Sequence, residues 1–248
     1  MSLSSLLALA LIGISAILLL ILSRLQRKAP PKVRAIPALT RLYRAIGLSV
    51  EDGTRLLIGL GNTSLLTGNA GAPLAGLAVL RHLTERTSLS DRPPVAVAGE
   101  APLALLAQDT LEAGYQSAGA GEFYQPTTGR VTGLTPFSSA AGTIPIMHDE
   151  NVSAAIFMGH YGIEAALLAD AAERGNAFAV GASDDLAGQA IWYASAPETL
   201  IGEELFAASA YIGATPSQTA SLTVQDILRW LIIVALVVGA GAKLVGLF

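Results

Sequence analysis

The chain has 248 residues, of which 52% are hydrophobic and only 14% are charged. That is more apolar than a soluble protein needs, so part of the surface is expected to face lipid. The length allows one globular domain of about 170 to 180 residues and two membrane segments. The chain contains no cysteine, which excludes disulfides, thiolate metal ligands and cysteine nucleophiles.

Charge is divided sharply along the sequence. Before Glu51 there are seven basic residues and no acidic one, whereas the stretch from Glu51 to Asp226 holds nineteen acidic and six basic residues, a net charge of −13. An acidic domain repels phosphate backbones, so nucleic acid is not an expected partner. The basic leader instead favours contact with the lipid bilayer.

An uncharged run of twenty residues, Leu3 to Leu22, opens the chain. At 1.5 Å per residue, a helix of that length crosses a hydrocarbon core of about 30 Å. A cleaved signal peptide is the rival interpretation, but no basic residue precedes the run and no A-x-A site follows it. The basic residues that come next are expected to stay at the cytoplasmic face and to contact lipid. They begin with Arg24, Arg27, Lys28 and Lys32 and continue with Arg34, Arg41 and Arg44.

Proline residues between positions 30 and 37 interrupt any continuous helix and lead into an amphipathic segment, residues 39–48. This segment lies either on the inner leaflet or against the domain. The predicted organisation is a transmembrane helix, a basic stem with the amphipathic segment, a cytoplasmic α/β domain and a second transmembrane helix. Their respective ranges are 1–23, 24–50, 51–225 and 226–248.

From residue 55 onward, apolar strands alternate with helices. The predicted strands are 55–60, 94–98, 152–158 and 178–181, and the predicted helices are 73–87, 102–117, 163–174, 186–193 and 199–211, with an irregular stretch over 119–143. Such alternation is typical of a parallel sheet that is covered on both faces. The expected fold class is therefore α/β, with a three-layer Rossmann-like domain.

The second predicted transmembrane helix ends the chain. Trp230 suits the head-group level, and Lys243 either extends to the far interface or faces a partner within the membrane. Gly239 and Gly241 allow another helix to approach closely, either from the same chain or from a second subunit. The protein is thus expected in the plasma membrane as a two-pass protein, with both termini outside and the α/β domain in the cytoplasm.

The loop after the first strand is the leading candidate for a binding site, because ligands bind at that end of a parallel sheet. Its candidate residues are Gly59, Gly61, Asn62, Thr63 and Ser64. The spacing fits neither the dinucleotide nor the P-loop motif, so no cofactor is predicted. A tight turn between strand and helix is the alternative. Asp109, on the second helix of the domain, is a further candidate, with an exposed helix charge as the simpler interpretation.

His160 and Glu164 are four residues apart at the start of a predicted helix, a spacing that can hold a divalent metal. A metal site needs three or four protein ligands, and the other histidines, His82 and His148, lie in different elements. Capping or packing is therefore the simpler role. An enzyme would need His160, Glu164 and Asp109 to converge in one cleft.

Four sequence phrases taken together resemble an uncharacterised family of bacterial and archaeal membrane proteins, the DUF6754 type. The phrases are SDRPP at 90–94, LAQD at 106–109, GHYGIEA at 159–165 and LIGEELFAA at 200–208. The resemblance covers most of residues 35–230 and implies one domain between terminal hydrophobic segments. It implies no activity.

The leading functional hypothesis is a membrane-anchored structural or scaffold protein whose α/β domains assemble into a homo-oligomer. It rests on the two spans with small residues and on the lack of reactive groups. The alternative is a membrane-tethered sensor that binds a small molecule at the loop after the first strand. An enzyme is the third hypothesis, and other membrane subunits are further candidate partners.

Overall fold

The computed structural model describes residues 3–26, 36–66, 69–213 and 216–244. The chain divides into two compact units, one formed by residues 1–34 with 213–248 and the other by residues 35–212. Each unit is described by itself.

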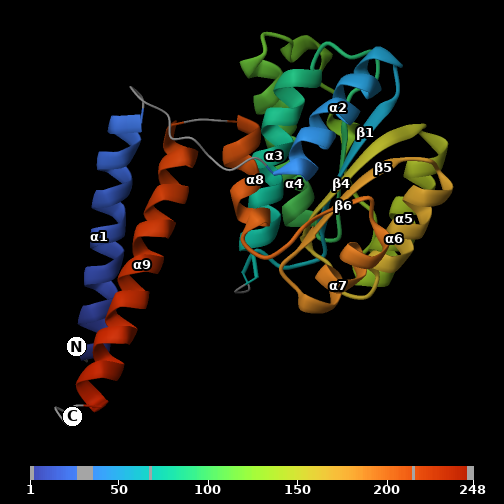
Figure 1. Cartoon of the computed structure of the whole chain (residues 1–248). Helices are drawn as coiled ribbons and strands as arrows, with labels where there is room; N and C mark the ends of the chain where they lie inside the picture. Colours follow the sequence, from blue (N-terminus) through green and yellow to red (C-terminus); the bar gives the residue numbers. More distant parts are fainter. Residues whose placement is uncertain (1–2, 27–35, 67–68, 214–215, 245–248) are drawn as a thin grey trace. The chain divides into compact units, whose positions relative to one another are not determined.

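The first unit is a pair of long helices, α1 (Leu3–Gln26) and α9 (Pro216–Leu244), which lie side by side and run in opposite directions (Figure 1). The amide of Gln26 donates a hydrogen bond to the hydroxyl of Thr223 at 2.9 Å. Within the described residues, the stretch Ser217–Gly241 of α9 is long and apolar enough to cross a membrane, whereas the apolar part of α1, Leu11–Gln26, is shorter. The structure therefore supports one of the two predicted spans by length and composition.

The small residues of both helices are open. No described residue lies within 4 Å of the position that a Cβ would take at Gly13, Gly239 or Gly241. The described contact between α1 and α9 is therefore not close at Gly239 and Gly241, the glycines that the sequence analysis assigned to helix packing. These surfaces stay available to another helix.

The second unit contains a six-stranded sheet in the order β3-β2-β1-β4-β5-β6, in which every neighbouring pair is parallel. The strands are β1 (Arg55–Gly61), β2 (Val95–Ala98), β3 (Gly129–Val131), β4 (Val152–His160), β5 (Phe178–Ser183) and β6 (Glu198–Leu200). This order is that of the doubly wound Rossmann sheet. The predicted parallel α/β class is confirmed.

Helices cover both faces of the sheet (Figure 1). One face packs against α2 (Pro37–Glu51), α3 (Gly71–Thr87), α4 (Ala101–Ser117) and α8 (Glu204–Gly213), and the other against α5 (Pro136–Asp149), α6 (Ala165–Arg174) and α7 (Leu186–Ser195). Along β1, Leu56 and Ile58 join the first core and Leu57 joins the second, as the alternation of a strand requires. Two short 3₁₀ helices, Gly121–Phe123 and Pro126–Thr128, precede β3.

Two predicted elements differ from the structure. The stretch predicted as irregular contains β3 and the start of α5, whose first turn is closed by reciprocal hydrogen bonds between Thr135 and Ser138. Ser138 takes the place of the usual Glu or Gln in this capping box, so the sequence signal was weak. The helix predicted from residue 199 begins instead at Glu204, because Glu198–Leu200 pairs with β5 as an edge strand.

Helix α2 is part of the domain and does not belong to a separate stem. Leu39, Leu42 and Ile46 are buried in the first core, so the docked alternative of the sequence analysis is the observed one. Arg41 forms an ion pair with Glu198 at 2.7 Å. The hydroxyl of Tyr43 donates to the carbonyl of Ile212, at the end of α8, at 2.7 Å. The compact unit that contains the sheet comprises residues 35–212.

Leu42→Ala tests this boundary. The side chain is 1% exposed, so its truncation leaves a cavity and should lower the free energy of unfolding of the domain by about 2–5 kcal/mol. The matched control is Leu48→Ala on the exposed side of the same helix, which should change it by less than about 0.5 kcal/mol. Urea unfolding of the full chain in detergent measures both. Equal effects of the two substitutions would mean that α2 is not part of the core.

Candidate functional site

The carboxyl edge of the sheet is the candidate site. The strand order reverses between β1 and β4, and at such a switch point the connections diverge to opposite faces and leave a crevice outside the strand ends. Three polar residues follow or end the strands there, namely Asn62 after β1, His160 at the end of β4 and Asp184 after β5. The sequence predicted Asn62 and His160 as separate candidates, and the sheet brings them to one edge, where the Asn62 N–H donates to the His160 carbonyl at 3.2 Å.

The two glycines of β1 are used for internal packing. A Cβ at Gly59 would lie 2.4 Å from the Tyr161 hydroxyl, and a Cβ at Gly61 would lie 2.5 Å from the His160 carbonyl oxygen. Gly61 also has a φ of +77°, which a residue with a side chain adopts only at a cost. The space that a ligand would need above these glycines is therefore filled by the chain itself.

One cavity lined by described residues lies at the switch point, and it is very small. Its volume is about 10 Å³, which is close to that of one water molecule and far below that of a nucleotide site. It is lined by Gly61, Asn62, Val97, Pro136, Ser139, Ala140, Thr143, Tyr161, Glu164 and Leu168. Glu164 is 5% exposed and accepts a hydrogen bond from the Gly162 N–H at 2.8 Å. The side-chain amide nitrogen of Asn62 is buried and has no hydrogen-bond partner among the described residues.

His160 pairs with Asp184, not with Glu164. The Nδ1 of His160 lies 2.7 Å from a carboxylate oxygen of Asp184, which the sequence analysis did not connect because the two residues end different strands. A carboxylate at Nδ1 orients the imidazole and leaves Nε2 for another partner. Among the described residues, no group of three or more His, Asp and Glu side chains is placed to hold a metal ion. The predicted metal pair therefore has no additional ligands in this part of the chain.

Tyr161 connects the carboxyl ends of β1, β4 and β5. Its hydroxyl accepts a hydrogen bond from the Gly61 N–H at 2.9 Å, and its ring packs edge-on against Phe157 and Trp192. The Ser183 hydroxyl, at the end of β5, donates to the Tyr161 carbonyl at 2.8 Å. Burial raises the pKa of Tyr161 far above its usual value, although the hydrogen bond from Gly61 opposes the shift.

The other predicted site residues lie apart from this cluster or serve the backbone. Asp109 is exposed on α4, near Tyr124, whose pKa it helps to raise, and it contacts neither His160 nor Glu164. Among the described residues, no hydrogen bond or ion pair joins Asp109 to His160 or Glu164. Thr63 is buried and Ser64 is half-buried in the loop after β1. The lipid-facing candidates Arg27, Lys28 and Lys32 lie outside the described residues, whereas Arg24, Trp230 and Lys243 are exposed on α1 and α9.

Large apolar side chains stand exposed around the carboxyl edge, on the loops after β1, β3, β4 and β5 and at the starts of the helices that follow. We call this group the carboxyl rim, and it consists of Leu66, Leu134, Phe137, Ile163 and Leu186. Leu66 is 97% exposed and Leu186 is 81% exposed. Sequence reasoning missed the rim because single apolar residues in separate loops carry no periodic signal.

Comparison with known proteins identifies the family. Residues 2–248 match the family model described as Domain of unknown function (DUF6754). The chain belongs to the DUF6754 family. The predicted membership of an uncharacterised DUF family is confirmed over residues 2–248, and the match carries no information on source organism or membrane location. Comparisons with curated proteins and with solved structures found no match.

The connecting role of Tyr161 in this DUF6754 chain predicts an alkaline loss of stability. Because the pKa is raised in the folded state, folding retains a proton that the unfolded chain loses above about pH 10. The stability contributed by neutral Tyr161 is therefore full below pH 10 and falls as the pH rises, by about 1.4 kcal/mol per pH unit. Urea unfolding between pH 9 and 11 measures the free energy of unfolding. This free energy should fall less steeply with pH for Tyr161→Phe than for the unaltered chain.

At neutral pH the same substitution should cost about 1–3 kcal/mol, because the buried Gly61 N–H loses its acceptor. Tyr193→Phe is the matched control, since this tyrosine is 74% exposed. If the free energy of unfolding fell equally steeply with pH in Tyr161→Phe and in the unaltered chain, the raised pKa of Tyr161 would not be the cause of the alkaline loss of stability.

Proposed function

We propose that this DUF6754 chain is a membrane-anchored scaffold whose α/β domains associate into a homo-oligomer through the carboxyl rim. The observation that carries the proposal is the exposure of the rim side chains on the loops of four strands. A soluble monomer rarely exposes large apolar groups together at one edge, and such groups mark interaction surfaces. The closed switch point supports the same conclusion, because it leaves little room there for a small molecule.

A second copy suits the rim better than a lipid surface does. Residues 62–70, 99–100, 132–135, 161–164 and 184–185, which follow the first five strands at this edge, contain no Lys or Arg. They contain Glu100, Asp184 and Asp185 in addition to the buried Glu164. Anionic head groups attract basic residues and repel acidic ones, so the apolar rim has no electrostatic help in binding a bilayer.

The open glycines of the helical unit offer a second contact between subunits. Gly239 and Gly241 have space beside them within the described residues, and small residues allow spans to associate closely. Contacts through both units would place several domains side by side at one membrane surface.

The assembly is tested by the double substitution Leu134→Glu with Leu186→Glu. Two carboxylates in the rim should weaken association by at least about tenfold, because charges would have to be buried in an apolar contact. The matched control is Leu89→Glu, in the loop between α3 and β2, where the side chain is 80% exposed at the other edge of the sheet. Native mass spectrometry of detergent-extracted protein measures the subunit number.

Salt provides an independent check on the same surface. Assembly would bring the acidic residues of two rims together, and salt screens that repulsion. Raising ionic strength from about 10 mM to about 150 mM shortens the screening length from about 30 Å to about 8 Å and should strengthen the oligomer. A strict monomer at all concentrations, or equal assembly of the rim variant and the control, would rule the proposal out.

We also propose that the chain crosses the plasma membrane twice, with both termini outside and the domain in the cytoplasm. The length of α9 supports one span. The antiparallel pairing of α1 with α9 (Figure 1) and the exposed Ile12 and Leu236 support the second, because apolar side chains of both helices are exposed within the part of the chain that the structure describes. The basic residues between α1 and α2 support the orientation.

Topology can be tested with single cysteines, because the natural chain has none. Ser2→Cys and Phe248→Cys should react with a membrane-impermeant maleimide on intact cells, since both ends are expected outside. Glu122→Cys, at an exposed position of the domain, should react only after the cells are opened. Labelling of Glu122→Cys on intact cells would reverse the orientation, and labelling of one terminus alone would reduce the spans to one.

A further inference from the structure

We propose that the groove along the outer edge of β6 binds an extended, basic segment of another protein, which adds a strand to the sheet. This groove is separate from the carboxyl rim and shares no residue with it. Its volume is about 590 Å³, within the range of protein sites that hold ligands. It is lined by Tyr193, Ala196, Pro197, Glu198, Thr199, Ile201, Glu203 and Glu204.

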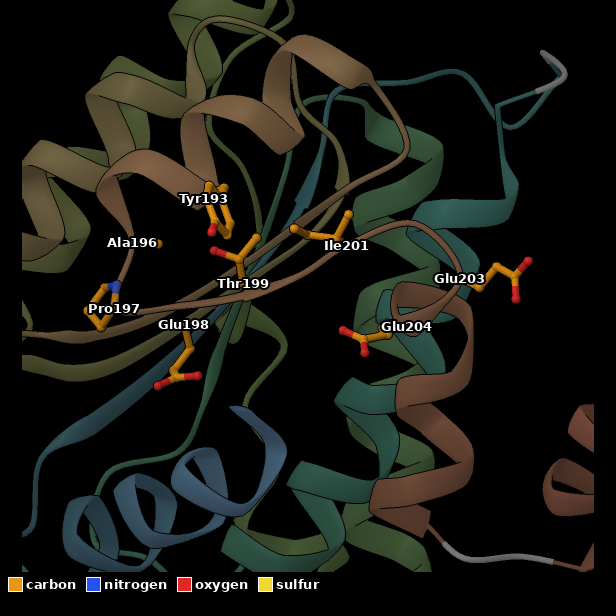
Figure 2. A pocket seen from close by; sticks show the side chains of 8 residues that line it. All are labelled: Tyr193, Ala196, Pro197, Glu198, Thr199, Ile201, Glu203 and Glu204. Carbon is orange, nitrogen blue, oxygen red and sulfur yellow. The ribbon is translucent and has the colours of Figure 1, made fainter. Parts of the chain in front are cut away.

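The position of the lining side chains shows that the groove follows the open edge of the strand. Tyr193 and Thr199 lie on one side of the β6 ribbon and Glu198 on the other (Figure 2). A groove lined from both faces of a sheet at its last strand occupies the place where the next strand would pair. An incoming strand would lie about 4.8 Å from β6.

The backbone of β6 has one edge that is not paired with another strand of the described chain. The strand ends the sheet order, and within the described residues its backbone pairs with β5 and with no other segment. The opposite edge is protected, because the Gln108 amide donates to the Gly129 carbonyl of β3 at 2.8 Å. Proteins usually protect exposed strand edges, and an unprotected edge is a template for another strand.

The acidic side chains of the groove determine which kind of segment it favours. Glu198, Glu203 and Glu204 line the groove, and Glu198 forms an ion pair with Arg41 of α2 at 2.7 Å. Pairing of β6 with β6 of a second copy would bring two acidic grooves together, and like charges across strands are destabilising. A basic partner is favoured for the same reason.

The two sides of the strand also predict the pattern of the incoming segment. Glu198 faces the side opposite Tyr193 (Figure 2), and Tyr193 and Ile201 are exposed by 74% and 45%. Side chains of a strand alternate between the two faces. The segment should therefore alternate basic side chains, placed on the side of Glu198, with apolar side chains, placed toward Tyr193 and Ile201.

The full chain in detergent allows a direct test with a fluorescein-labelled peptide of alternating Lys and Val, six residues long and blocked at both ends. Fluorescence anisotropy at about 50 mM salt should show saturable binding. A peptide of alternating Glu and Val should bind at least about tenfold more weakly. The Lys-Val peptide with N-methyl groups on alternate backbone nitrogens should also bind at least about tenfold more weakly, because it cannot complete the ladder of hydrogen bonds.

The double substitution Glu203→Lys with Glu204→Lys should weaken binding of the Lys-Val peptide by about tenfold, since each exposed ion pair contributes up to about a factor of five. Glu112→Lys, at an exposed position on α4, is the control and should bind normally. Circular dichroism establishes that both variants are folded. No binding by the unaltered chain, equal binding of the N-methylated peptide, or equal binding by the two variants would overturn the proposal.

Discussion

The contact between Tyr161 and the glycines of β1 determines how the carboxyl edge of this domain can be used. Parallel sheets of this order usually bind ligands where the connections diverge at the switch point. Here the Tyr161 hydroxyl accepts the Gly61 N–H and occupies the space beside Gly59. The ring is held in turn by Phe157 and Trp192. The place of the usual ligand is therefore part of the core, and the exposed features of the edge lie around it.

Because the switch point has little free volume, the surfaces of this domain that can bind partners are the outer ones. The carboxyl rim presents apolar groups, and the edge of β6 presents backbone and acidic groups. The two surfaces suit different partners, since apolar groups associate with other apolar surfaces whereas an acidic strand edge favours a basic segment. Together with the apolar helix pair, these surfaces are the basis of the proposed scaffold function.

The sequence predicted those features of the fold that depend on local pattern. The apolar runs at β1, β2, β4 and β5 were found, because strands buried on both faces read as continuous apolar segments. The edge strands β3 and β6 were missed, because three-residue strands are too short to carry a period. The amphipathic pattern of α2 was read correctly. Such a pattern does not show whether the apolar face of the helix packs against a protein core or against a bilayer.

The candidate site was harder to predict, because its contacts join residues that are distant in sequence. His160 with Asp184 and Gly61 with Tyr161 are brought together by strand order. The sequence analysis therefore paired His160 only with Glu164, with capping or packing as the simpler role, and it left the glycines between a ligand loop and a tight turn. Knowledge of the strand order alone would have placed His160 and Asp184 on adjacent strand ends.

Hydrogen exchange of the full chain at low and high protein concentration tests the central claim, that subunits meet at the carboxyl rim. The account predicts slower exchange at high concentration in residues 132–137, 161–164 and 184–187, with no change in residues 88–94 and 118–125 at the other edge. Slower exchange at that other edge, or no concentration dependence in either set of loops, would contradict it.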